Sequence, residues 1–173
     1  MSDPADLIVA DQDLLDLLLE WGADPSRVCV SEVLDSYNSN LFTRYHGLGV
    51  DFTAGHELAS ALGYHNSNKP LFGWAKHHRN DPKIQKELDM ALAHHANLGN
   101  EKGVQLCLWA GGNAHAPVPS LEFPDVVDEE DAEDGEDAFL GWSTVQEAAH
   151  RGHTRILERL GPDPAIDDFE DLY

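Results

Sequence analysis

The sequence predicts an all-α protein, a helical-repeat solenoid of stacked helix-turn-helix units with an acidic loop insertion. Apolar residues recur at three- and four-residue spacing in several separate runs, which indicates helices that each bury one face. A glycine turn follows each run, and a proline-bounded acidic stretch interrupts the series. The 173 residues are enough for a single domain with its own core.

The four clearest runs share one layout. They cover residues 14–21, 41–46, 104–109 and 156–160, and the turns that follow contain Gly22, Gly49, Gly111 and Gly161. Glycine can take the left-handed conformation that ends a helix, and an Asp or Asn beside it can bond its own backbone. Residues 56–63 and 70–75 are expected to form two further helices, with Pro70 in a first turn.

Residues 91–116 resemble an ankyrin repeat without a gap. The matching positions are Ala91-Leu92 for the family's Pro-Leu, His95-Ala96 for its paired alanines, Gly99 for the glycine between helices, Val104 and Leu106-Cys107-Leu108 for the second helix, and Gly111-Gly112-Asn113 for the closing Gly-Ala-Asp.

A second match begins at Gly141. Residues 141–153 look like the family's Gly-x-Thr-Pro-Leu-His-x-Ala-Ala-x-x-Gly-His, and Ala148-Ala149 falls on its paired alanines. The resemblance implies one ankyrin-like repeat domain of about four to five units over residues 1–173. It also implies a protein-binding module rather than an enzyme.

The spacing of the glycines indicates an insertion. Gly49 and Gly111 lie 62 residues apart, close to two periods of the roughly 33-residue ankyrin unit. Gly22 and Gly49 are only 27 apart, whereas Gly111 and Gly161 are 50 apart. The last interval therefore contains additional chain.

Residues 117–140 supply this additional chain. Pro117, Pro119 and Pro124 exclude a regular helix, and nine of the thirteen residues 125–137 are acidic. So many like charges cannot be buried, which predicts an exposed, mobile loop. The residues expected to contact a partner there are Asp128, Glu129, Glu130, Asp131, Glu133, Asp134, Glu136 and Asp137.

Residues 162–173 are expected to form a C-terminal cap. Ile166, Phe169 and Tyr173 fall at three- and four-residue spacing, which is typical of a short amphipathic helix over the last apolar face. The alternative is that the natural chain continues past Tyr173.

The net charge of −21 narrows the classes of partner. Direct binding to nucleic acid or to an anionic membrane is not expected, because Lys and Arg drive such binding. A basic surface on another protein is expected to be attracted. The alternative is that the acidity serves solubility alone, and the oligomeric state stays open.

The compartment is expected to be the cytoplasm. The first residues, Met1-Ser2-Asp3-Pro4, lack the basic start and apolar core expected of a signal peptide, and no apolar run approaches the roughly 20 residues of a membrane span. Cys29 and Cys107 both have apolar neighbours, which favours buried, reduced thiols over a disulfide.

Motifs for chemistry are missing, so no catalytic residue, cofactor or metal is expected. The ten histidines do not follow zinc-binding spacings, and no phosphate-binding glycine loop or nucleophile motif is present. A metal-dependent hydrolase built from the histidines and carboxylates is a third, weaker reading of the sequence.

The four tryptophans allow two interpretations. Trp21, Trp74, Trp109 and Trp142 recur near comparable points of the units, which favours packing between helices. Alternatively, Trp74 or Trp142 is partly exposed as an interface anchor, since Trp is common at binding hot spots.

The leading functional hypothesis is a scaffold, adaptor or inhibitor with a groove over Asp24, Asp51, Asn113 and the start of the unit at Gly141. Its acidic loop would bind a basic partner. The alternative is a nucleic-acid-mimicking inhibitor of a DNA- or RNA-binding protein, in which carboxylates imitate phosphates.

Overall fold

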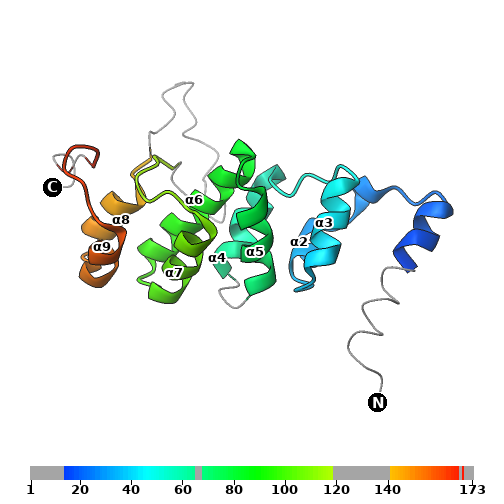
Figure 1. Cartoon of the computed structure of the whole chain (residues 1–173), viewed down its shortest axis with the longest axis horizontal. Helices are drawn as coiled ribbons and strands as arrows, with labels where there is room; N and C mark the ends of the chain where they lie inside the picture. The colour runs from blue at the N-terminus through cyan, green and yellow to red at the C-terminus, as the bar shows by residue number, and fades with distance from the viewer. Residues whose placement is uncertain (1–13, 65–67, 119–140, 168, 170–173) are drawn as a thin grey trace, which may run out of the picture.

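The computed structural model describes residues 14–64, 68–118, 141–167 and 169, and within these ranges it is all-helical apart from turns and one isolated bridge (Figure 1). The all-α prediction is therefore confirmed for the described chain. Residues 14–20 are helical. The labelled elements are η1 Pro25–Arg27, α2 Val30–Leu34, α3 Ser39–Gly47, η2 Ala54–His56, α4 Glu57–Tyr64, α5 Lys69–His78, α6 Pro82–Asn97, α7 Glu101–Ala110, α8 Thr144–His150 and α9 Thr154–Leu160.

The helices pack in two rows along the long axis of the molecule (Figure 1). One row consists of α2, α4, α6 and α8, each in contact with the next. The other row consists of α3, α5, α7 and α9. The two rows are joined by contacts between consecutive helices, most extensively between α6 and α7 and between α8 and α9.

All six helical segments expected from apolar spacing are present. The helix expected at residues 70–75 is α5, which Asn68 caps by accepting from the Leu71 amide while Pro70 occupies the first turn. The five-residue helix α2 was not expected from the apolar spacing. Its shortness accounts for the 27-residue interval between Gly22 and Gly49.

The core runs through both rows. Its largest fully buried side chains include Phe42, Phe52, Phe72, Leu58, Leu62, Leu71, Ile84, Leu88, Leu92 and Ile156. Burying one such side chain stabilises the fold by roughly 1.5–3 kcal/mol. The 16-residue helix α6 contributes ten buried residues, so it is the central element of the stack.

Consecutive helices form the pairs α2/α3, α4/α5, α6/α7 and α8/α9. The turns that follow helix 14–20, α3, α7 and α9 repeat one geometry, whereas α5 is followed by Arg79-Asn80-Asp81 without a glycine. Gly22, Gly49, Gly111 and Gly161 all have positive φ, which L-residues with a side chain rarely adopt. Two residues later a side-chain oxygen accepts a backbone N–H, as expected from the sequence. The pairs are Asp24 with Ser26 (2.9 Å), Asp51 with Thr53 (2.9 Å), Asn113 with His115 (3.1 Å) and Asp163 with Ala165 (2.9 Å).

At the opposite ends of the helices, three side chains each donate to a carbonyl of the preceding pair. The bonds are Asn68 Nδ2 to Leu34 O (2.9 Å), His95 Nε2 to Leu62 O (3.0 Å) and His153 Nε2 to Asn97 O (3.0 Å). The sequence separations are 34, 33 and 56 residues. Without the 22 residues 119–140, the last separation would be 34, so the same contact recurs at a constant period.

The C-terminal segment differs from the expected amphipathic helix. Residues 164–167 form one turn, and Ile166 is 62% exposed instead of facing the core. Asp163 explains the difference, because its carbonyl accepts from the Ile166 and Asp167 amides and its carboxylate from the Ala165 amide. Phe169 packs against the core, and Tyr173 lies outside the described residues.

The two cysteines have different environments. Cys107 is buried in α7, and burial together with the nearby Asp89 carboxylate raises its pKa far above the usual range of a thiol. Cys29 is exposed, so the expectation that it is buried is wrong. It precedes the first turn of α2 and lies outside the apolar stripe of any helix.

No helix among the described residues is long and apolar enough to cross a membrane.

Candidate functional site

Charge is divided unevenly along the chain. All 11 Lys and Arg lie in the described ranges, together with 15 of the 32 Asp and Glu, so the described part has a formal charge of −4. The other 17 carboxylates lie in residues 1–13, 119–140, 168 and 170–173, which contain no Lys or Arg. The helical body is therefore close to neutral, and the sequence-wide acidity does not describe its surface.

The residues predicted to contact a partner fall into three groups in the structure. The eight carboxylates from Asp128 to Asp137 lie outside the described residues. Trp142 is half-buried, with its ring edge-on to His150 at 4.6 Å between centroids. Trp74 is only 4% exposed, so its interpretation as an exposed anchor is corrected, because α5 directs this indole into the core.

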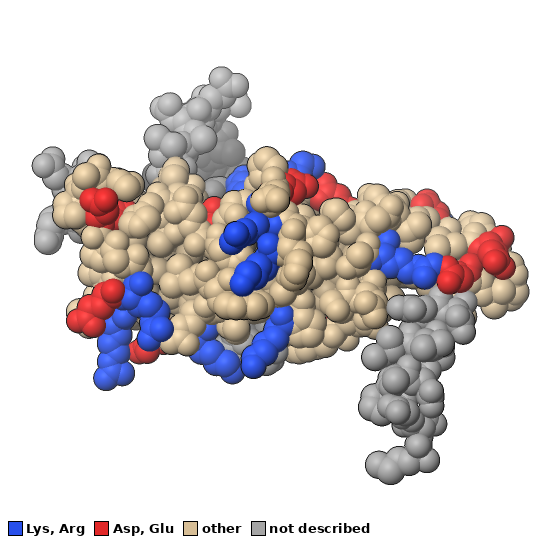
Figure 2. Space-filling view, in the orientation of Figure 1, with Lys and Arg blue, Asp and Glu red and all other residues tan. Residues whose placement is uncertain are grey.

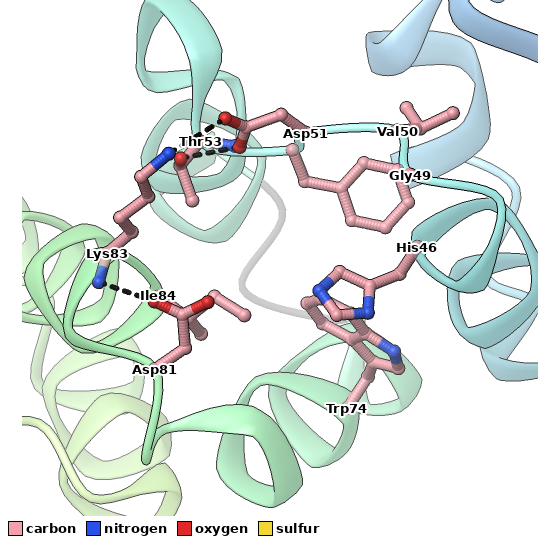
Figure 3. A pocket seen from close by; sticks show the side chains of 10 residues that line it. His46, Gly49, Val50, Asp51, Thr53, Trp74, Asp81, Lys83 and Ile84 are labelled. Atoms are coloured by element: carbon pink, nitrogen blue, oxygen red, sulfur yellow. Dashed lines mark hydrogen bonds and ion pairs between the residues drawn. The ribbon is translucent and has the colours of Figure 1, made fainter.

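A pocket of about 250 Å³ lies where the turn after α3 meets the start of α6 (Figure 3). One side is polar and is formed by Asp51, Thr53, Asp81 and Lys83. The other side is largely aromatic. It is lined by His46, Phe52 and Trp74, with Gly49, Val50 and Ile84 completing the wall.

Asp51 is held in its turn by two hydrogen bonds from Thr53. Its Oδ1 accepts from the Thr53 hydroxyl (2.6 Å) and amide (2.9 Å), while Oδ2 lies 3.2 Å from the Lys83 ammonium. The hydroxyl bond, followed by the amide bond, holds the pKa of this carboxyl below its usual value. Asp51 therefore presents an ionised carboxylate to the pocket. This carboxylate forms an ion pair with the Lys83 ammonium.

Asp81 provides the second carboxylate. It caps α6, and its Oδ1 accepts from the Lys83 amide at 2.9 Å. Since one oxygen suffices for the cap, the other is available to a ligand. Figure 3 shows that the two carboxylates come from separate turns and that the Lys83 side chain reaches from α6 to Asp51.

The aromatic wall is rigid because its rings pack on one another. Trp74 contacts Phe52 edge-on at 5.3 Å, contacts His46 edge-on at 5.3 Å, and stacks on His78 at 4.3 Å between centroids. The His78 ring is itself fixed by a hydrogen bond from Nδ1 to the Trp74 carbonyl (2.8 Å). The pocket thus combines a preformed apolar wall with two carboxylates.

The groove expected over Asp24, Asp51, Asn113 and the Gly141 unit is not one pocket. Of these four positions, only Asp51 lines the pocket. The sequence reasoning missed Asp81 and Lys83. The pattern Asn80-Asp81-Pro82 was the available signal, since Asp before Pro marks a helix start where carboxylates collect.

A Ser-His-Asp group lies near the C-terminal end. Asp167 is buried, and it accepts from His115 Nδ1 (3.0 Å), the Asp163 amide (2.8 Å) and Ser143 Oγ (3.3 Å). The Ser143 hydroxyl donates to the Asp167 carboxylate and accepts from the Gln146 amide, so its bonds are not to a histidine nitrogen. The arrangement fastens the C-terminal segment, and it lacks the serine–imidazole bond that activates a nucleophile.

Among the described residues, no group of three or more His, Cys, Asp and Glu is placed to hold a metal ion.

Comparisons with known proteins gave no relative: no protein-family model matches the sequence, and no similar curated protein or solved structure was found.

Proposed function

We propose that this chain is a non-enzymatic protein-binding module of ankyrin-type helix pairs that binds a partner with a basic surface. The observation that carries the proposal is the pocket between successive turns, where a rigid aromatic wall faces the carboxylates of Asp51 and Asp81. A Lys or Arg side chain of a partner would place its alkyl stem on the wall and its charge at the carboxylates.

Lys83 supports this choice of ligand. The Lys83 ammonium already forms an ion pair with Asp51, although the Lys83 side chain is 69% exposed and the Asp51 side chain 48% exposed. An exposed pair of this kind contributes little stability, so a better placed cation from a partner can replace Lys83 at small cost.

The repeat interpretation is supported by geometry. Two rows of helices, one recurrent turn and one recurrent bond between pairs are expected of a stack in which every unit contacts its neighbours. In such stacks the turns lie along one edge, and insertions there often belong to the binding face.

The acidic insertion would assist the pocket by attracting the basic partner over a longer range. In the proposal, the eight carboxylates from Asp128 to Asp137 speed the encounter with a basic partner and make its binding sensitive to salt. The pocket then contributes specificity, because it can receive only a side chain of suitable length and charge.

The pocket is tested by a variant that removes charge without removing the turns. Asp51→Asn with Asp81→Asn keeps the side-chain oxygens that accept from Thr53 and Lys83. Binding of a fluorescent Arg- and Lys-containing peptide by the full chain should weaken about tenfold in this variant. Glu57→Gln with Glu158→Gln is the matched control, since it changes net charge equally, on α4 and α9.

The insertion is tested separately by replacing the eight carboxylates with Asn and Gln. Peptide affinity should then depend less steeply on salt concentration. Equal affinity for the wild type, the pocket variant and the control would overturn the role of the pocket. An unchanged salt slope in the insertion variant would overturn the role of the insertion.

A further inference from the structure

The two helical rows differ in charge. The row of α3, α5, α7 and α9, with Arg79 at the end of α5, contains Arg44, Lys69, Lys76, Arg79, Lys102, Arg155 and Arg159 against Glu101 and Glu158. The row of α2, α4, α6 and α8, with its capping residues counted in the same way, contains Lys83, Lys86 and Arg151 against Glu32, Asp35, Glu57, Asp81, Glu87, Asp89 and Glu147. Figure 2 shows Lys and Arg side chains over the face that carries α5, α7 and α9.

The centre of this face is formed by Lys76, Arg79 and Trp109. The Lys76 ammonium lies 4.1 Å from the centroid of the Trp109 ring, and the ring reaches across to Gly73 on α5. Arg79 extends from the end of α5 to Gly111, just after α7. The two cations and the indole thus form one surface that joins two adjacent helices.

Several properties of these three residues indicate a binding surface. Trp109 is 53% exposed, although Trp is among the largest apolar side chains. Among the described residues, no carboxylate forms an ion pair with Lys76 or Arg79, so both cations are available to carboxylates of a ligand. The dipole of α5 accounts for cations in its last turn, but it does not account for an exposed indole beside them.

We infer that the Lys76–Arg79–Trp109 surface binds an acidic polypeptide segment of a partner protein. Carboxylates of the segment would pair with the two cations, and an apolar side chain between them would cover the exposed side of the Trp109 ring. Trp and Arg are among the residues enriched at binding hot spots. This surface selects the opposite charge to the pocket at Asp51 and Asp81, so the inference does not depend on the proposed function.

A polypeptide fits this surface better than a nucleic acid. A nucleic acid needs several phosphates neutralised at once, and it extends beyond the surface into the field of the chain's other charges. The 17 carboxylates outside the described ranges would repel it. A short acidic segment interacts mainly with groups within a Debye length of about 8 Å at physiological salt, so its carboxylates can pair with Lys76 and Arg79 without extending over the rest of the molecule.

Fluorescence anisotropy with the full chain tests the inference. The probes are a short labelled Glu-rich peptide with a central Leu, the same peptide with Gln for Glu, and a single-stranded oligothymidylate of equal charge. We expect the Glu-rich peptide to bind, more weakly as salt rises, and the other two probes to bind at least about tenfold more weakly.

Two pairs of variants locate the site. Lys76→Gln with Arg79→Gln should weaken binding of the Glu-rich peptide about tenfold, while Arg27→Gln with Lys86→Gln, which removes two cations elsewhere, should change it less than about twofold. Trp109→Ser should weaken binding, and Trp109→Phe should largely retain it. Circular dichroism establishes that each variant is folded.

The inference is overturned if the Glu-rich peptide fails to bind, if both cation variants weaken it equally, or if Trp109→Ser has no effect. Tighter binding of oligothymidylate would overturn it in favour of a nucleic-acid surface.

Discussion

His95 connects two neighbouring helix pairs through both ring nitrogens. Its buried ring donates from Nε2 to the Leu62 carbonyl (3.0 Å), so Nδ1 is left as an acceptor, 3.1 Å from Asn100 Nδ2. Asn100 in turn caps α7. Protonation of Nδ1 would place two donors against each other, and burial, the largest cause, lowers the pKa of His95 below its usual value.

This arrangement predicts a loss of stability in mild acid. The unfolded chain binds the proton near pH 6.5 while the folded chain resists it, so stability is complete above about pH 6.5 and falls as pH decreases below that value. The loss from one such histidine is at most about 1.4 kcal/mol per pH unit. Urea unfolding of wild type and His95→Gln between about pH 7.5 and pH 5.5 measures it.

The glutamine variant should show a shallower dependence on pH, because Gln can still donate to Leu62 without titrating. His77→Gln is the control for a histidine-to-glutamine change at an exposed position. Identical slopes in His95→Gln and wild type would show that His95 is not the group responsible.

At the scale of the element, α6 and α7 approach each other tightly where Gly103 faces His95. A Cβ at Gly103 would overlap the imidazole, and the His95 ring is fully buried with both nitrogens bonded, so it cannot move aside. The absence of a side chain here therefore determines how near the two helices lie.

Gly103→Ala should destabilise the protein by about 1–3 kcal/mol, as expected for overpacking. Gly47→Ala is the matched control, because no atom lies within 4 Å of a Cβ there and its φ is not positive. The control should be neutral or stabilise by about 0.4–1 kcal/mol. Chemical denaturation of both variants gives the comparison, and equal stabilities would rule out the steric role of Gly103.

The sequence was sufficient to place helices and turns, because these depend on neighbours within a few residues. Apolar spacing predicted α5 and α9, and glycine followed by Asp or Asn predicted the turn at Gly49. The pocket depends on a long-range contact, since Lys83 reaches Asp51 across 32 residues of sequence. Spacing within one helix cannot supply such a contact.

Trp74 and Trp109 illustrate the same limit. Both occupy apolar stripes of helices in the same row, yet one is 4% and the other 53% exposed. Phe52 and His46 cover Trp74, whereas Trp109 extends over the surface of α5 toward Lys76. The exposure of each tryptophan therefore depends on the side chains of the neighbouring helix pair. The apolar pattern of a single helix does not contain this information.

At the scale of the whole molecule, the acidic insertion begins and ends at two points that lie side by side. Pro117 and Ser143 form an antiparallel bridge, and the Val118 amide lies 3.5 Å from the Trp142 carbonyl. Val118 is buried in a small cluster with Ala59, Met90 and Ala93. Both ends are thus fixed by the helical body itself.

Replacing residues 119–140 with a short Gly-Ser linker should therefore leave the fold intact. The change removes ten carboxylates and takes the formal charge from −21 to −11. Helical circular dichroism should keep its native shape, and stability should rise by about 1 kcal/mol because a shorter loop costs less entropy to close. Loss of cooperative thermal unfolding would show instead that the insertion is needed for folding.

The bonds from Asn68, His95 and His153 to the preceding pair also have a mechanical consequence. Each crosses one boundary between pairs, so a force applied between the two ends of the stack loads the three boundaries in series. Tension is then equal at every boundary, and the weakest one separates first while the others stay closed. Under load the molecule should therefore extend in discrete steps, each caused by the separation of one helix pair from its neighbour.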